Sequence, residues 1–81
     1  MLFISLLVPK GKGVEAVNYI KGLKAPKSIT LRHVHLTFGR YDGVIIFEAP
    51  DLKTAMNFSM QVGFATGYTV ETLAAVSAKE L

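Results

Sequence analysis

The stretch HVHLTFGRYDGVIIFE, residues 33–48, contains two segments typical of β-strands and the turn between them. In its first half, apolar side chains alternate with polar ones: Val34, Leu36 and Phe38 against His33, His35 and Thr37. Glycines at both ends of residues 39–43, with an aspartate between them, favour a tight turn. The apolar run that follows is typical of a second strand. We therefore expect an antiparallel hairpin with strands over 28–38 and 43–49.

Outside the hairpin, the chain predicts one strand and one helix on each side. Residues 2–8 are apolar apart from Ser5, which indicates a strand covered on both faces. Residues 14–24 have the spacing of an amphipathic helix, and residues 68–77 that of a last strand after a loop at 63–67. Asp51 is a suitable N-cap for a second helix. The expected inner sides of the two helices comprise Val14, Val17, Ile20 and Leu23 in the first, and Leu52, Ala55, Met56, Ser59 and Val62 or Gly63 in the second, with Phe58 and Met60 off that side.

The order strand–helix–strand–strand–helix–strand (βαββαβ) predicts an α+β fold of the ferredoxin-like type. Right-handed crossovers place both helices on one face of a four-stranded antiparallel sheet, with the spatial strand order 4-1-3-2. The other sheet face is then left open.

The open face is expected to mix apolar and polar side chains. We expect Val34, Leu36, Phe38, Ile45, Phe47, Tyr68, Val70, Ala74 and Val76 to face the helices. On the open face we expect Phe3, Ser5, Leu7, His33, His35, Thr37, Val44, Ile46, Glu48, Thr69, Glu71, Leu73 and Ala75. Such a surface is too apolar for solvent and too polar for a dry core. It suits a dimer whose two sheets enclose a cavity.

The amino-acid composition also favours contact with a second copy of the chain. The chain has 81 residues, of which 51% are hydrophobic and 19% charged, below the roughly 25% of an average soluble domain. A small apolar chain usually hides its excess in a subunit contact, so we expect a homodimer or a higher even oligomer. The lack of cysteine excludes a disulfide scaffold, a cysteine-ligated zinc site and a cysteine nucleophile. No stretch has the length of a membrane span or the pattern of a secretory signal, so a cytoplasmic location is expected.

Positive charge is concentrated in the first part of the chain, within the overall net charge of +3. Residues 9–32 hold six lysines and arginines and one glutamate, and could attract an anionic ligand or form a solvated helix face. Within them, KGKG at residues 10–13 resembles a phosphate cradle before a helix, but it lacks the spacing of a P-loop and reads better as a loop.

The hairpin also carries a family resemblance. Residues 37–42 (TFGRYD), followed by 44–51 (VIIFEAPD), resemble the signature of the GYD domain family, and residues 69–73 are similar to its last strand. The resemblance implies a dimeric α/β barrel built from one domain over residues 1–81. The hairpin and last strand are also similar to the effector-binding regulatory domains of Lrp/AsnC transcription regulators. Those domains bind small molecules at oligomer interfaces, and this chain has no DNA-binding domain beside it.

A histidine pair is the first candidate site. His33 and His35 lie on one strand face, about 6.6 Å apart along the chain. With Glu48 or Glu71 as a third ligand they could bind zinc or non-haem iron. The alternative is that both imidazoles make hydrogen bonds in an interface or lie in water.

Three further residues are candidates for ligand binding. Tyr41 and Asp42 could present a phenol and a carboxylate, or Asp42 could bind turn amides while Tyr41 packs over the hairpin. Glu71, on the open face, could carry a proton or anchor a ligand. Alternatively, it forms a salt bridge with Arg32 or Arg40 of a second subunit.

Three functions remain open at this stage. The first is a binding protein for a small organic or anionic molecule held between subunits. The second is a small enzyme, using a metal on His33 and His35 or using Glu71 without a cofactor, and the third is a purely structural oligomerisation module. The sequence names no cofactor. Nucleic acid is not an expected partner, because Asp42 and Val44 stand where an RNA-recognition motif has stacking rings, and no membrane is expected.

Overall fold

The computed structural model of the protein describes residues 1–8 and 14–81. Its elements are β1 (Leu2–Val8), α1 (Val14–Lys21), β2 (Thr30–Leu36), β3 (Gly43–Glu48), α2 (Leu52–Thr66), β4 (Thr69–Ala75) and the short 3₁₀ helix η1 (Ala78–Glu80). The predicted order of strands and helices is confirmed. The loop and phosphate cradle expected at residues 10–13 lie outside the described residues.

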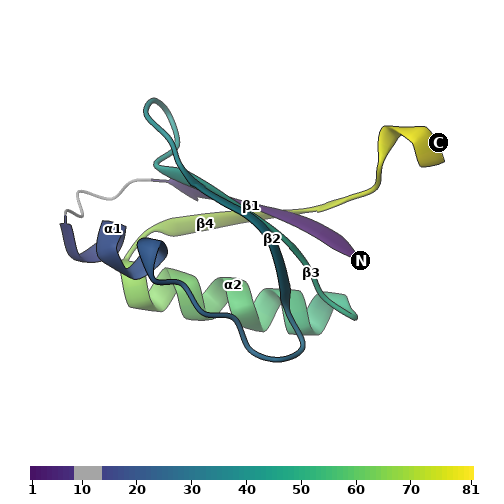
Figure 1. Cartoon of the computed structure of the whole chain (residues 1–81), viewed down its shortest axis with the longest axis horizontal. Helices are drawn as coiled ribbons and strands as arrows, with labels where there is room; N and C mark the ends of the chain where they lie inside the picture. The colour runs from purple at the N-terminus through teal and green to yellow at the C-terminus, as the bar shows by residue number, and fades with distance from the viewer. Residues whose placement is uncertain (9–13) are drawn as a thin grey trace.

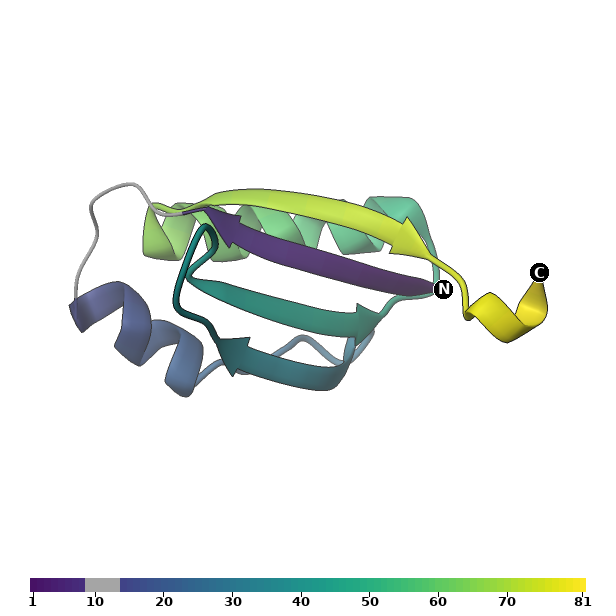
Figure 2. The same cartoon turned by 90° about the horizontal axis from the view of Figure 1, so that it is seen from above.

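The four strands form one antiparallel sheet in the order β2-β3-β1-β4. Both helices lie on the same side of this sheet, and the other side is uncovered (Figures 1 and 2). This is the predicted ferredoxin-like α+β arrangement. β2 and β4 are the two edge strands, so the residues that they carry border the uncovered side.

The core lies between the sheet and the helices and centres on three phenylalanines. The rings of Phe3 and Phe47 stack with centroids 5.5 Å apart, and Phe58 of α2 meets Phe47 edge-on at 5.0 Å. Offset and edge-on pairs are the favourable geometries for aromatic rings. The other buried apolar residues are Leu7, Ala16, Ile20, Ile29, Ile45, Ala49, Ala55, Val62 and Tyr68.

Both ends of α2 are fixed by capping interactions. The Asp51 carboxylate accepts a 2.8 Å hydrogen bond from the Thr54 amide, and this bond lowers the pKa of Asp51. At the other end Gly67 adopts φ 76° and donates to the Gly63 carbonyl at 2.8 Å. The loop expected at 63–67 is therefore wrong, because α2 passes through Gly63 and ends at Thr66. No helix within the described residues has the length and apolarity needed to cross a bilayer.

Three hydroxyl groups join α2 to the sheet inside this otherwise apolar layer. The Thr72 hydroxyl lies 2.8 Å from both the Ser5 and the Ser59 hydroxyls, and the two serine oxygens are 3.4 Å apart. Ser5 belongs to β1, Ser59 to α2 and Thr72 to β4. Each buried hydroxyl thus has a partner, and Thr72 is the common one.

Replacing Thr72 by valine is expected to lower the free energy of unfolding by about 1–2 kcal/mol, because two buried serines lose their shared partner. Urea unfolding at one fixed protein concentration measures the change. The matched control is Thr69→Val, on the same strand but exposed, which should stay within about 0.5 kcal/mol of wild type. An equal effect of both variants would contradict this role of the hydroxyl cluster.

The face assignment of β1 corrects the prediction. Phe3, Ser5 and Leu7 were expected on the open face, but all three are buried beneath the helices. The side chains that point away from the helices are those of Leu2, Ile4, Leu6 and Val8, which are half-buried. Every position of β1 except Ser5 is apolar, so the sequence lacks the alternation that would have fixed its faces.

Several side chains expected to face the core lie in solvent instead. Leu52 and Met56 are exposed, while Phe58, expected off the inner side of α2, is buried together with Ala55, Ser59, Val62 and Thr66. Val14 is also exposed, and Ala16 takes its place in the core. Phe38 and Val76 are exposed because they lie beyond the ends of β2 and β4. In contrast, Val34, Ile45, Phe47 and Val70 have the predicted faces.

Candidate functional site

The candidate site is the uncovered side of the sheet, which we call the open sheet face. Residues directly opposite each other on antiparallel strands point to the same side, so the strand register defines this surface. Its side chains are those of Leu2, Ile4, Leu6, Val8, Thr30, His33, His35, Val44, Ile46, Glu48, Thr69, Glu71, Leu73 and Ala75, with Arg32 at the β2 edge.

Two rows of side chains cross the open sheet face from edge to edge. One runs His33–Ile46–Ile4–Leu73, and the next runs His35–Val44–Leu6–Glu71. In both rows the two central strands contribute aliphatic side chains. The histidines end the rows at the β2 edge, and Glu71 ends the second row at the β4 edge. The surface is therefore apolar in the middle and ionisable at its margins.

A β-bulge in β2 places both histidines on the open sheet face. Leu31 pairs with Phe47 and His33 with Ile46, so Arg32 is the extra residue. The bulge lets Leu31 and Val34, three positions apart, both pack against the core. Strict alternation from Leu31 would have turned His33 toward the helices. The prediction that the histidines face outward is confirmed, but no residue pattern in the strand indicated the bulge.

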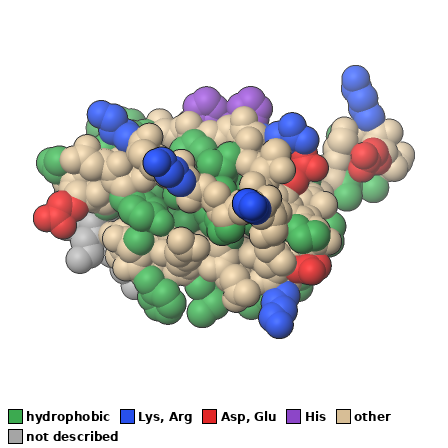
Figure 3. All heavy atoms as spheres, turned by 60° about the horizontal axis from the view of Figure 1, so that its bottom comes forward, with side chains coloured by type: hydrophobic (Ala, Val, Ile, Leu, Met, Phe, Trp, Pro, Cys, Tyr) green, Lys and Arg blue, Asp and Glu red, His purple; other side chains and the backbone are tan. Residues whose placement is uncertain are grey.

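The two imidazole rings lie side by side. Their centroids are 5.7 Å apart and their planes differ by 16°, and both side chains are exposed. In Figure 3 they form a continuous pair at the margin of the molecule. Two exposed imidazoles on one strand face offer nitrogen donors to a ligand, and rotation of their side chains would be needed for both to bind one ion.

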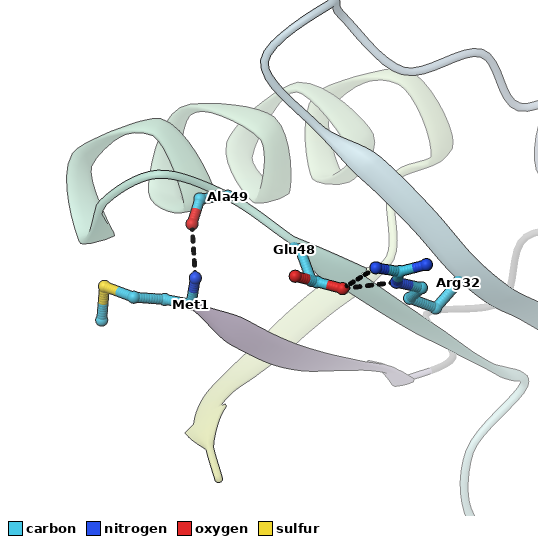
Figure 4. Close-up of polar contacts among 4 residues, drawn as sticks. All are labelled: Met1, Arg32, Glu48 and Ala49. Carbon is cyan, nitrogen blue, oxygen red and sulfur yellow. Dashed lines mark hydrogen bonds and ion pairs between the residues drawn. The ribbon is translucent and has the colours of Figure 1, made fainter.

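Glu48 is engaged within its own chain. Its carboxylate pairs with the Arg32 guanidinium, the residue that the bulge adds to β2 (Figure 4). The same figure shows the Met1 amino group donating to the Ala49 carbonyl at 2.9 Å, which fixes the start of β1 beside the end of β3. Both Arg32 and Glu48 are solvent-exposed enough that the pair contributes little stability. The ion pair occupies the Arg32 guanidinium, which was a predicted partner of Glu71 in a second subunit. It also occupies the Glu48 carboxylate, which was a predicted metal ligand.

Glu71 is far from the histidines within one chain. Three strand spacings of about 4.8 Å separate the β2 and β4 edges, so His35 and Glu71 lie roughly 14 Å apart. Within residues 1–8 and 14–81, no three histidine, cysteine or acidic side chains come together as a metal site would require. A single copy of the described chain thus holds the His33 and His35 pair without its predicted carboxylate ligand.

Tyr41 and Asp42 lie at the β2–β3 turn, away from the centre of the open sheet face. Asp42 uses its backbone for the turn: its amide donates to the Leu7 carbonyl at 2.8 Å, and its carbonyl accepts from the Thr37 amide at 2.9 Å. The Arg40 guanidinium carbon lies 5.8 Å from the centre of the Tyr41 ring. The contacts of Asp42 within the turn are thus made by its backbone, and the Tyr41 ring lies beside Arg40.

Tyr68 is a residue that sequence reasoning did not connect with the turn. It is buried just before β4, and burial together with the nearby Asp42 carboxylate raises the pKa of its phenol. Asp42 therefore links the β2–β3 turn to the start of β4. No spacing rule relates residues 42 and 68, so the sequence contained no signal for this contact.

A hollow lies at the end of the open sheet face where the chain leaves β4. Its volume is about 560 Å³, within the range of small-molecule sites. The lining residues are Met1, Leu2, Glu48, Ala74, Ala75, Val76, Ser77 and Glu80. It combines aliphatic walls with the carboxylates of Glu48 and Glu80.

Comparison with known proteins gives one match. The family model described as the GYD domain matches residues 12–81 of the 81. No curated protein and no solved structure matches the chain.

Proposed function

The chain belongs to the GYD domain family, and from this premise we propose that it binds a small molecule between the open sheet faces of two copies. The observation that carries the proposal is the pattern of the open sheet face, which is apolar along β1 and along β3 as far as Glu48, and ionisable at both edges. An apolar floor with a few polar groups at its margins is the usual composition of a small-molecule site.

The second copy would cover the aliphatic side chains of the open sheet face, whose contact with water is unfavourable. Four strands of about seven residues cover roughly 19 by 23 Å, and an apolar patch of that size on a monomer is often an interaction site. Seven aliphatic side chains larger than alanine contribute to it: Leu2, Ile4, Leu6, Val8, Val44, Ile46 and Leu73. Packing of two such faces would form a sandwich with a core about 10 Å thick.

The proposed ligand is a small organic molecule with an apolar body and a polar or anionic group. The aliphatic centre would hold the body, and the exposed imidazoles of His33 and His35 would donate hydrogen bonds to the polar group. Nucleic acid fits less well, since the Phe3 and Phe47 rings lie on the helix side and are unavailable for stacking. We place this binding protein in the cytoplasm.

A small enzyme is the second candidate, favoured by one observation. The parallel stacking of His33 and His35 at 5.7 Å gives two adjacent nitrogen donors bordering the apolar surface. Metal chemistry there, or proton transfer by Glu71, would use the same surface as the binding role. If side chains of the second copy filled the open sheet face completely, no space would remain for a ligand. The structural oligomerisation role would then be favoured.

Native mass spectrometry of protein purified without added ligand tests the proposal. An even oligomer that retains a reproducible extra mass is the expected result, and that mass would identify the class of ligand. A bare monomer at micromolar concentration would overturn the proposal. A bare dimer whose interface excludes the environment-sensitive dye ANS would favour the structural role.

Replacing Leu73 by aspartate is expected to convert the oligomer to monomers or aggregates. The substitution puts a charge in the row that Leu73 shares with Ile4 and Ile46, inside the proposed contact, where a buried carboxylate costs several kcal/mol. Size-exclusion chromatography with light scattering measures the change. The matched control is Leu52→Asp, because Leu52 is 55% exposed against 52% for Leu73 but lies at the start of α2, where a negative charge is tolerated. An unchanged oligomer for Leu73→Asp would contradict the open sheet face as the contact.

A further inference from the structure

We propose that His33 and His35 of one copy and Glu71 of the other bind a divalent transition-metal ion at each lateral edge of the dimer. The inference rests on the proposed pairing of open sheet faces. It adds a ligand set that the described residues of one chain do not assemble.

Symmetry limits how two identical sheet faces can meet. The two-fold axis of such a dimer lies between the sheets and parallel to them. If the axis runs along the strands, β2 of one copy lies opposite β4 of the other. If it runs across the strands, each edge strand lies opposite its own counterpart, β2 on β2 and β4 on β4.

Charge distinguishes these two arrangements. The β2 edge carries the imidazoles of His33 and His35, with Arg32 already paired to Glu48, whereas the β4 edge carries the Glu71 carboxylate. An axis across the strands would bring the histidine pairs together at one edge and the two acids together at the other. An axis along the strands brings the histidines of one copy to the acid of its partner at both edges. Complementary charges favour this second arrangement.

The row positions agree with a shared site. His35 and Glu71 end the same row of the open sheet face, so an axis along the strands superposes the two ends of that row. His33 lies two residues further along the same strand face. Packed sheets are about 10 Å apart, a gap that a histidine and a glutamate side chain can close from opposite sides with an ion between them.

The chemistry of the three donors selects the ion. Two imidazoles and a carboxylate suit Zn²⁺, Fe²⁺ and similar ions, and they leave at least one coordination position open. That position would face the aliphatic centre of the sandwich, where the proposed ligand lies. Mg²⁺ and Ca²⁺ prefer sites made of oxygen donors and are not expected to bind here.

Titration of the metal-free dimer with Co²⁺ tests the site, because the visible absorption of Co²⁺ reports its coordination. Wild type should bind two ions per dimer. Three variants, His33→Ala, His35→Ala and Glu71→Gln, should each weaken binding at least about tenfold while the dimer persists. Thr69→Gln, at the same β4 edge but outside the two rows, is the control and should bind as wild type.

Mixed dimers test whether the donors come from two chains. One partner carries His33→Ala with His35→Ala, and the other carries Glu71→Gln, each with its own affinity tag. The mixed dimer regains one intact site, formed by the histidines of the second chain and Glu71 of the first. A homodimer of either variant contains no intact site and should not show the Co²⁺ spectrum. A mixed dimer without the Co²⁺ spectrum would overturn the proposal.

Three other outcomes would also refute the metal site, and they separate it from the proposed function. Unchanged Co²⁺ affinity in Glu71→Gln would mean that the histidines bind alone. A stable dimer that binds no Co²⁺ would contradict the metal site while leaving the small-molecule binding role intact. A protein that stays monomeric would contradict both the metal site and the binding role.

Discussion

Replacing Phe47 by alanine is expected to lower the free energy of unfolding by about 4 kcal/mol, the typical cost of truncating a buried phenylalanine. The side chain is completely buried, stacks on Phe3 and meets Phe58 edge-on. Its removal would leave a cavity at the contact between β1, β3 and α2. For 81 residues the whole stability is roughly 4–12 kcal/mol, so the variant would be close to unfolding.

Urea unfolding followed by circular dichroism, at one protein concentration, measures this loss. The matched control is Phe38→Ala, because Phe38 is a fully exposed phenylalanine in the turn that precedes β3. Its replacement should change stability by less than about 0.5 kcal/mol. If the two variants were equally destabilised, the assignment of Phe47 to the core and Phe38 to the surface would be wrong.

Replacing Gly43 by alanine is expected to cost about 2 kcal/mol, because the added methyl group has no room. A Cβ at this position would lie 2.9 Å from the His35 carbonyl oxygen and 3.0 Å from the Leu7 Cδ1 atom. The carbonyl belongs to the neighbouring strand and cannot move without disturbing the pairing of β2 with β3. Overpacking of this kind usually costs 1–3 kcal/mol, that is, about 2 here.

The matched substitution is Gly63→Ala in α2, which should have the opposite sign. A Cβ there would meet its nearest neighbours, the Tyr68 carbonyl and the Val70 side chain, at 3.5 and 3.6 Å, an ordinary contact. Alanine in a helix interior is favoured over glycine by up to about 1 kcal/mol. Thermal unfolding of both variants should show a lower midpoint for Gly43→Ala and a higher one for Gly63→Ala. The same sign for both would refute the packing described at Gly43.

Most of the fold could be predicted because the hairpin has a clear alternation. Val34 against His33 and His35 gave the faces of β2, and the shortness of the turn gave the antiparallel pairing with β3. Once the hairpin was recognised, the sequence order of the remaining strands and helices predicted the order of strands in the sheet, which the structure confirms. The helix boundaries were predicted less accurately, because the low helix propensity of glycine had different effects in the two helices. Gly22 ends α1 early, but Gly63 does not interrupt α2.

The candidate site could be predicted only in part. The outward positions of His33, His35 and Glu71 followed from alternation and are confirmed. The Arg32–Glu48 pair depends on a bulge, and the Tyr68–Asp42 contact joins residues distant in sequence, so neither had a local signal. Whether the β2 and β4 edges cooperate depends on a second copy, and a single sequence pattern holds no information on that geometry.

The hydroxyl cluster has a consequence for how the chain finds its fold. Leu2, Ile4 and Leu6 are nearly as apolar as Phe3 and Leu7, so a strand turned over by one residue would still bury hydrocarbon against the helices. Such an alternative is a competing energy minimum close to the native one. Only the native alignment lets Ser5 meet Thr72 and Ser59. The single serine in this strand of seven residues therefore adds a polar preference for the native alignment to the one that the packing of Phe3 and Leu7 already provides.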